Sequence, residues 1–496
     1  MYAIIKVYIL ICTYNFFQLL FYLLFFLFTA SIQYWKERIM SFADIVSYVD
    51  GIVWGIPLIV ILLGTHIFMT IRTGFVQKHV IKGIKLSVTP DQDGEGEVSQ
   101  FGALATALAA TIGTGNIVGV STALIAGGPG AILWMWLTGV FGMASKYGES
   151  YMSIKYRVQT KDGRMLGGAM YALERGLNMK WLAILFALFG AFAAFGIGCM
   201  TQANSISTAF HDNFGIPAWI IGIIVAVFLA VVIIGGVQSI TKVTSMLVPF
   251  MALFYVVGCV IVLIINRAYI GEAFSWIITA AFAPKAGFGG LAGFAVGQAV
   301  RYGCARGLFS NESGMGSAPL VAAAAKTKNP ARQALVSMTG TFWDTVVICL
   351  LTGLTLVSAV CKNPSLGDTM ADKTVLTFTV FETIPVIGKP LIAIALALFA
   401  FSTLLGWSYY GERCAEYLAG SKIILPYKIA FVIFAFVGSV TALDTVWNLA
   451  DILNGLMVIP NVVGMIMLSG MIAKEGNYFI HHIDEESKDE IPVVER

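Results

Sequence analysis

Two glycine-rich stretches inside apolar segments decide the fold of this chain: TIGTGNIVG at residues 111–119 and GLFSNESGMG at residues 307–316. Glycine destabilises a helix interior by about 1 kcal/mol, so clustered glycines favour local unwinding. Unwound backbone within a membrane is tolerated only where it is buried in protein or lines a wet cavity. Each stretch therefore predicts a broken helix and a candidate binding site.

The composition is that of an integral membrane protein. Of 496 residues, 58% are hydrophobic and 12% are charged, and the mean hydropathy is +0.83, which excludes a water-exposed globular surface. Seven scattered cysteines indicate neither disulfides nor zinc, and a net charge of +3 indicates no nucleic-acid partner. Apolar stretches of about 18 residues or more cross a bilayer. We expect an all-α membrane protein of about eleven transmembrane helices, near residues 51–71, 101–125, 129–154, 181–209, 217–235, 244–266, 287–325, 333–360, 389–411, 428–444 and 448–473.

The two broken helices divide these spans into two groups. Residues 101–266 hold five predicted spans that open with the first glycine cluster, and residues 287–473 hold five that open with the second. Because five is odd, the second group enters from the opposite side of the membrane, which makes an inverted repeat of the kind found in secondary transporters. Small residues also serve close helix packing in membranes, but two clusters at matching positions favour broken helices. The span at residues 51–71 is peripheral to this core.

Charged residues in the loops predict the orientation. Short loops rich in Lys and Arg stay in the cytoplasm, and such loops lie at residues 72–100, 155–180 and 326–332, although the outer loop at residues 361–388 also carries two lysines. The expected organisation is an N-terminal extension, a peripheral span with a cytoplasmic loop, two repeats joined by an outer loop and a cytoplasmic tail, at residues 1–40, 41–100, 101–266, 267–286, 287–473 and 474–496.

The N-terminal extension breaks the charge pattern. Residues 7–31 are nearly all apolar, but Lys36 and Arg38 follow them on the expected outer side. Three interpretations stay open: a twelfth span, a signal-like leader, or a start assigned too far upstream with the true initiator at Met40. The last is favoured.

Charged residues inside one predicted span sharpen the second candidate site. Arg301, Arg306 and Glu312 lie within residues 287–325, where each would cost about 2.5–3.5 kcal/mol if it faced lipid. We expect Glu312, with Asn311, to shape the site at the break, while the arginines gate the path or pair with carboxylates. A buried ion pair between Glu312 and one arginine is the alternative. Glu149 is assigned a structural role.

Four motifs resemble signatures of the alanine or glycine:cation symporter family, also called the sodium:alanine symporters or amino acid carrier proteins. They are GTGNIVGVSTA, GGPGAILWMW, ARGLFSNESGMGSAP and FSTLLGWSYYGE, at residues 113–123, 127–136, 305–319 and 401–412. The resemblance covers roughly residues 45–475. It implies a leucine-transporter-like core, import of a small neutral amino acid with Na⁺ across a bacterial-type cytoplasmic membrane, and no organic cofactor. Ser313 departs from the family pattern, in which alanine is usual.

A zwitterionic amino acid matches the polar groups that a broken helix offers. Amide groups around Gly115 and Asn116 suit its carboxylate, and carbonyls near Thr111 and Ser310 suit its amino group. Gln202 is assigned to the substrate, with a structural hydrogen bond between helices as the alternative. The predicted substrate-binding residues are Thr111, Gly113, Thr114, Gly115, Asn116, Gln202, Ser310, Asn311, Glu312, Gly314, Met315 and Trp407.

Two adjacent hydroxyls predict an ion site. Ser402 and Thr403 lie in an apolar span, with Trp407 one turn beyond Thr403 on the same helix face. By resemblance, they coordinate Na⁺ together with the carbonyls of Ala109 and Ile112, and Trp407 lines the substrate pocket. Such hydroxyls also bond back to the preceding turn of a membrane helix, which is the competing interpretation. Proton coupling is the main alternative mechanism.

Other functional classes have little support. We find no zinc-protease motif, no serine-hydrolase motif with a partner histidine and no carboxylate pair, so an enzyme is not expected. A channel also uses interrupted helices, but polar side chains from two related breaks suit an occluded site better. The serious alternative is a carrier of the same fold for another small solute. The sequence does not indicate an oligomeric state.

Overall fold

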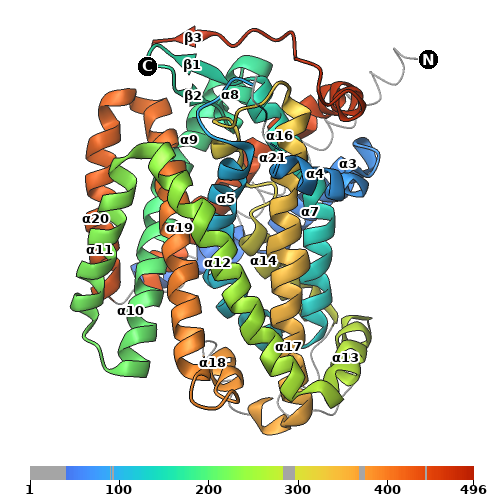
Figure 1. Cartoon of the computed structure of the whole chain (residues 1–496), viewed down its shortest axis with the longest axis vertical. Coiled ribbons are helices and arrows are strands. Elements are labelled where there is room, and N and C mark those ends of the chain that lie inside the picture. The colour runs from blue at the N-terminus through green and yellow to red at the C-terminus, as the bar shows by residue number, and fades with distance from the viewer. Residues whose placement is uncertain are drawn as a thin grey trace.

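The computed structural model describes residues 41–89, 91, 94–282, 296–367, 375–441 and 444–495, and most of them are helical (Figure 1). The predicted N-terminal extension at residues 1–40, with its three interpretations, lies outside the described residues.

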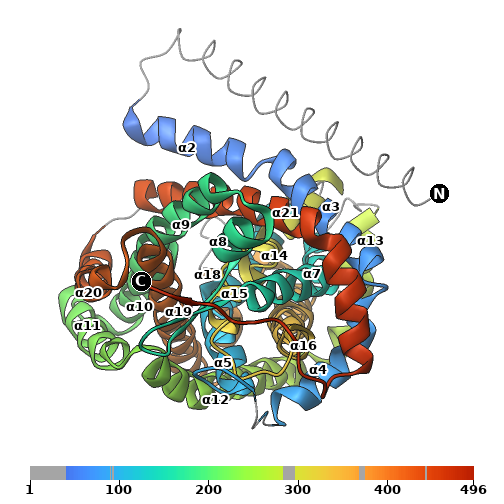
Figure 2. The ribbon, with the colours of Figure 1, turned by 90° about the horizontal axis from the view of Figure 1, so that it is seen from above.

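The peripheral part consists of two helices. Helix α2 (Phe42–Val53) begins with a capping box between Ser41 and Asp44, and α3 (Ile56–Arg72) begins after Gly55. Helix α3 is the predicted span at residues 51–71, whereas α2 lies beside α21 (Asp444–His481) at the edge of the molecule (Figure 2). The chain then continues through η1 (Val76–His79) and α4 (Val80–Ser87).

The first repeat opens with the predicted broken helix. Helix α5 (Gln100–Thr111) ends inside the first glycine cluster, and the chain resumes through the π-turn η2 (Gly115–Gly119) into α6 (Val120–Gly127), bent by 52°. The remaining elements are α7 (Gly130–Lys155), α8 (Ala169–Tyr171), η3 (Ala172–Gly176), α9 (Lys180–Phe195), η4 (Gly196–Met200), α10 (Thr201–Phe214), α11 (Ala218–Ile234) and α12 (Gly236–Ile265).

The second repeat opens in the same way. Helix α14 (Val296–Asn311) ends inside the second glycine cluster, and a non-helical segment separates it from the short α15 (Pro319–Ala322). The break is thus confirmed at both clusters. The later elements are α16 (Pro330–Thr341), η7 (Phe342–Cys349), α17 (Leu350–Lys362), η8 (Pro364–Gly367), α18 (Val375–Phe381), α19 (Gly388–Ala419), η9 (Ser421–Ile423), α20 (Ile424–Val440) and α21.

Two segments predicted to lie outside the spans are partly helical. The expected outer loop at residues 267–286 contains η5 (Arg267–Tyr269) and α13 (Ile270–Phe282), which packs Ala273, Ile277 and other small or apolar residues against α7 and α17. Helix α21 continues to His481, so the first part of the predicted tail at residues 474–496 is helical. Polar residues at a helix surface do not end a helix when one face still packs, and the division of the chain into segments stays a prediction.

The number of crossings stays a prediction. Among the described residues, seven helices are long and apolar enough to cross a membrane, and the bent pair α5–α6 raises this to eight. Helices α7 and α11 are not among these; α7 contains the buried charges Lys146 and Glu149, and α11 has only 17 residues. Helix α7 nevertheless lies inside the bundle, and α11 packs against α20 at its edge (Figures 1 and 2).

A small sheet lies at one end of the bundle. We call this end of the bundle the strand end. Strands β1 (Val158–Thr160), β2 (Met165–Leu166) and β3 (Val493–Val494) form it in the order β2-β1-β3, at the top of Figure 1. The predicted cytoplasmic segments meet here: Glu95 bridges to Thr327, and Gln159 pairs with Val493. Their common location agrees with the loop charges.

Candidate substrate and ion site

A small buried cavity of about 20 Å³ lies where the two broken helices meet α10, α19 and α21. A cavity of this size holds about one water molecule. Its wall combines the break after α5 with the end of α14. The lining residues are Ala110, Thr111, Gly113, Thr114, Gly115, Ile197, Gln202, Phe309, Ser310, Glu312, Thr403, Trp407 and Asn454.

Most of the predicted substrate residues line this cavity. Those that do are Thr111, Gly113, Thr114, Gly115, Gln202, Ser310, Glu312 and Trp407. Asn116 lies just behind the wall, where its Oδ1 accepts a hydrogen bond of 2.9 Å from the amide of Gly113. Asn311, Gly314 and Met315 do not line the cavity. Asn311 and Met315 are buried, Gly314 packs against Leu62, and Asn311 Oδ1 accepts a hydrogen bond from the amide of Ser313. Gln202 donates to the carbonyl of Ile197, within its own helix.

Glu312 closes the cavity together with Trp407. The Trp407 indole Nε1 donates to Glu312 Oε1 at 3.0 Å, and Ser317 Oγ donates to Oε2 at 2.5 Å. Glu312 has a φ of 52°, in the left-handed region, so its backbone turns the chain at the end of α14. The expected alternative of a pair with Arg301 or Arg306 is not formed among the described residues. The Arg301 guanidinium lies instead over the ring of the next residue, Tyr302, and the Arg306 guanidinium lies over the ring of Phe309, one turn further along α14.

The break after α14 is held by an ion pair on α7 to which the sequence reasoning gave only a structural role. Lys146 Nζ lies 3.3 Å from Glu149 Oε1 and donates to the carbonyl of Glu312 at 3.0 Å. Glu149 Oε2 accepts from the amides of Gly314 and Gly316, both at 3.1 Å. The side chain of Asn461 adds a further hydrogen bond to Glu149, at 2.9 Å. This arrangement satisfies backbone groups that no helix satisfies.

The predicted ion residues converge on the end of α5. Ser402 Oγ lies 3.0 Å from the carbonyl oxygen of Ala109 and 3.4 Å from that of Ile112. Both hydroxyls also bond back to Phe399, as the competing interpretation expects. A Cβ at Gly113 would lie 2.4 Å from Thr403 Oγ1, so only glycine permits this approach. Neutral hydroxyls and free helix-end carbonyls are the oxygens that fit a coupling cation in broken-helix transporters.

Asp344 is a candidate ion ligand that the sequence reasoning missed. It is fully buried and accepts hydrogen bonds from Asn116 Nδ2 at 2.7 Å, Ser310 Oγ at 3.1 Å and Thr345 Oγ1 at 2.6 Å. No Lys or Arg pairs with it in the described part of the chain. An acidic residue inside a predicted span, here residues 333–360, is itself a signal of function, and that signal was available.

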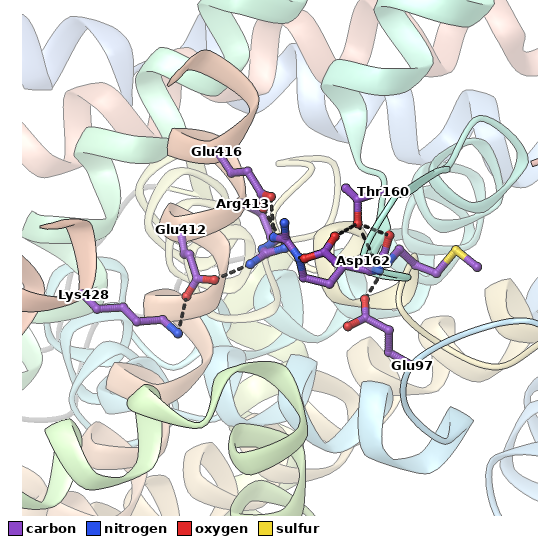
Figure 3. A network of polar contacts seen from close by, with 9 residues as sticks. Glu97, Thr160, Asp162, Glu412, Arg413, Glu416 and Lys428 are labelled. Atoms are coloured by element: carbon purple, nitrogen blue, oxygen red, sulfur yellow. Dashed lines mark hydrogen bonds and ion pairs between the residues drawn. The ribbon is translucent and has the colours of Figure 1, made fainter. Parts of the chain in front are cut away.

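A charged network lies near the strand-end part of α19, beyond the cavity residues Thr403 and Trp407 in the chain (Figure 3). On α19, Arg413 pairs with Glu412 and Glu416, and Glu416 also pairs with Arg164 from the strand hairpin. Lys428 lies 3.4 Å from Glu412. Glu97, just before α5, accepts from a hairpin amide, and its burial raises its pKa. Residues of this network, among them Glu97, Arg164 and Arg413, line a wider cavity of about 560 Å³.

Sequence comparison decides the family. The sodium:alanine symporter family matches residues 39–493. This chain is a sodium:alanine symporter family member. The symporter is 51% identical over 457 residues to the sodium/alanine symporter AgcS of Methanococcus maripaludis, a match that covers 90% of this chain and 100% of AgcS. It is 35% identical to the probable sodium/glutamine symporter GlnT of Bacillus subtilis, with 86% and 88% covered. It is therefore a transporter and not an enzyme.

Solved structures show the fold of the symporter. MhsT in complex with L-phenylalanine superposes with a TM-score of 0.53 at 14% identity, covering 77% of this chain and 99% of that one. A Na⁺-coupled sialic acid symporter gives 0.53 at 12% identity, covering 85% and 98%. The predicted all-α, leucine-transporter-like fold is confirmed. Together with the family, it makes the symporter a multi-pass, Na⁺-coupled amino acid transporter.

Proposed function

We propose that this symporter imports alanine or glycine together with Na⁺ across a bacterial-type cytoplasmic membrane. The proposal of a small substrate rests on the residues that line the cavity. Gly113 and Gly115 line this cavity without side chains, and Trp407 and Phe309 contribute large rings to its wall. A Cβ at Gly115 would already touch Ser310 at 3.4 Å, so the two breaks approach closely and leave little room for a side chain.

The ends of the broken helices supply partners for both charges of the substrate. The start of η2 presents backbone amides near Thr114 and Gly115, where the positive end of the α6 dipole attracts a carboxylate. The last turn of α14 presents carbonyls near Phe309 and Ser310, where the negative end of that dipole attracts an ammonium group. Trp407 and Glu312 would close over the bound amino acid.

The coupling ion would bind between α5 and α19. The hydroxyls of Ser402 and Thr403 and the carbonyls of Ala109 and Ile112 supply neutral oxygens. An ion here favours the arrangement in which the end of α5 packs on α19, and so couples ion binding to the shape of the substrate site.

Asp344 supports a second cation at the same break. Its carboxylate lies behind Asn116, whose amide also bonds Gly113, and Ser310 belongs to both the cavity wall and the Asp344 cluster. A buried carboxylate without a paired base is stabilised by a cation. This cation is Na⁺ or, in the alternative mechanism, a proton.

A competition assay tests the proposal. Purified symporter in proteoliposomes should accumulate radiolabelled alanine only with an inward Na⁺ gradient, and unlabelled glycine or alanine should compete while valine and leucine should not. Accumulation driven by a pH gradient without Na⁺ would favour the proton-coupled alternative. Competition by an unrelated solute but not by amino acids would favour the carrier for another small solute.

A further inference from the structure

The segment after α21 crosses the strand end as an extended strap, which we define as residues 482–495. It leaves the last helix and runs over the bundle to β3 (Figures 1 and 2). There Val493 and Val494 pair in parallel with Gln159 and Thr160 of the hairpin between α7 and α8. An edge strand that accepts an added strand gains backbone hydrogen bonds along its length.

The strap is bound at both of its ends. Near α21, Asn329 Nδ2 donates to the carbonyls of Ile483 and Glu485, both at 2.8 Å, and Arg332 Nη1 pairs with Asp484 at 3.0 Å. The backbone amide of Ser487 donates to the carbonyl of Lys328 at 2.9 Å. These contacts fasten the strap to the loop that precedes α16.

The hairpin end is fastened by charge as well as by the strand. Lys155 Nζ lies 2.7 Å from Asp489, and Lys161 pairs with Glu495. Burial alone would raise the pKa of Asp489, but its hydrogen bonds to Lys155 and Ser487 outweigh burial and lower the pKa. Asp489 is therefore ionised at neutral pH, and the pair with Lys155 is formed there.

The hairpin in turn holds the chain that enters the first broken helix. Arg157 Nη2 donates to the carbonyl of Glu95 at 3.0 Å, and the amide of Met165 donates to Glu97 Oε1 at 2.6 Å. Helix α5 begins directly afterwards at Gln100. The hairpin also carries Arg164, which pairs with Glu416 on α19. The strap thus lies outside a hairpin that bonds α19 and the segment that leads into α5. These two helices flank the candidate ion site.

We propose that the strap is a latch that stabilises the state in which the strand end is closed. Opening toward this end needs α5 to separate from α19, and that separation breaks the hairpin contacts with Glu95, Glu97 and Glu416. The strap resists this movement because it ties the hairpin to the loop at residues 328–332. The expected effect of the strap on transport rests on the proposed function, Na⁺-coupled import of alanine or glycine, whereas its expected effect on the strand end does not.

Hydrogen exchange of the purified full-length symporter tests the latch without a substrate. In a variant that lacks residues 483–496, amides at residues 94–99, to which the described strap residues form no hydrogen bond or ion pair, should exchange about three- to tenfold faster, as an equilibrium shift toward the open strand end requires. Unchanged exchange at residues 94–99, with faster exchange only at the β1 positions that lose their partner, would overturn the latch.

A milder variant tests the same proposal if the deletion variant does not fold. The triple change Asp484→Asn, Asp489→Asn and Glu495→Gln removes the ion pairs of the strap and retains its backbone. It should raise exchange at residues 94–99 by a smaller factor, and 0.5 M salt should raise it in the wild type by a similar factor. The matched control is Glu490→Gln, because Glu490 forms no hydrogen bond or ion pair with the described residues. Equal exchange in the triple variant and the control would contradict the proposal.

Uptake measurements distinguish an error in the latch proposal from an error in the proposed function. With the strap deleted, the alanine concentration for half-maximal uptake should rise about two- to fivefold, because fewer molecules present the site to the outside. If exchange increases but no amino acid is transported by either protein, the latch stands and the proposed substrate is wrong. If uptake is normal and exchange is unchanged, the substrate stands and the latch is wrong.

Discussion

Two kinds of polar side chain lie at the first helix break, neutral hydroxyls and a carboxylate. Ser402 and Thr403 present neutral hydroxyls to the end of α5, which suits an ion that must later leave. Asp344 presents a buried carboxylate to the neighbouring side of the same break. Substituting a hydroxyl should therefore affect ion binding less than substituting the carboxylate, and separate variants can test the two.

Replacing Thr403 with alanine should raise the Na⁺ concentration for half-maximal uptake about fivefold, because a neutral oxygen ligand contributes about 1 kcal/mol. The alanine requirement at saturating Na⁺ should change less. Initial rates of uptake over a Na⁺ series measure both, and Thr403→Ser, which keeps the oxygen, is the control. Unchanged Na⁺ dependence would remove Thr403 from the ion site.

Replacing Asp344 with asparagine should weaken Na⁺ binding at least about tenfold, since it removes a charge but keeps the shape of the side chain. The control is Thr352→Val on the same span, which removes a buried hydroxyl bonded to Tyr255. Isothermal titration with Na⁺ gives the readout. If both variants bind Na⁺ like the wild type, the carboxylate is structural.

Helix breaks act as units because close backbone approach and buried charge fix their geometry. At the first break, a Cβ at Gly113 would lie 2.4 Å from Thr403 Oγ1, whereas a Cβ at Gly119 would meet no atom within 4 Å. At the second, Lys146 and Glu149 bind the backbone that follows α14. Both breaks therefore depend on residues from other helices.

The Gly113→Ala variant should abolish Na⁺-driven uptake, because the added methyl group pushes α19 away from the end of α5. Gly119→Ala should transport normally, and even gain slightly in stability, since alanine favours a helix by about 1 kcal/mol. Uptake normalised to the amount of folded protein distinguishes them. Equal activity of the two variants would show that the contact at Gly113 is dispensable.

Breaking the pair on α7 should destabilise the folded symporter strongly. Lys146→Met leaves Glu149 buried without its cation and should cost about 3–5 kcal/mol, while adding Glu149→Gln to it should recover part of this loss. Thermal unfolding in detergent measures the three free energies. Additive losses in the double variant would mean that the two residues act independently.

On the scale of the whole molecule, the basic loops and the tail gather at the strand end, where they bind one another. We expect this end to face the cytoplasm, because translocating Lys and Arg is unfavourable. An enzyme reporter that is active only in the cytoplasm, fused after residue 496, should be active. A reporter active only outside the membrane should be silent at the same position, and the reverse pattern would invert the assigned direction of opening.

The sequence by itself determined the membrane class, the two helix breaks and most of the residues around the cavity. These follow from local causes, since hydrophobic length specifies a span and clustered glycine unwinds a helix. It also pointed to the hydroxyls of Ser402 and Thr403, because two polar groups in an apolar span need partners.

Only the tertiary structure decided which distant groups meet. Glu149 binds backbone amides 165 positions away, and Asp344 meets Asn116 across 228 positions. The strap pairs with a hairpin more than 300 residues earlier in the chain. No spacing or composition encodes such contacts, because they depend on how helices pack against one another. The breaks could be read from the chain, but what stabilises them came from helices elsewhere in the fold.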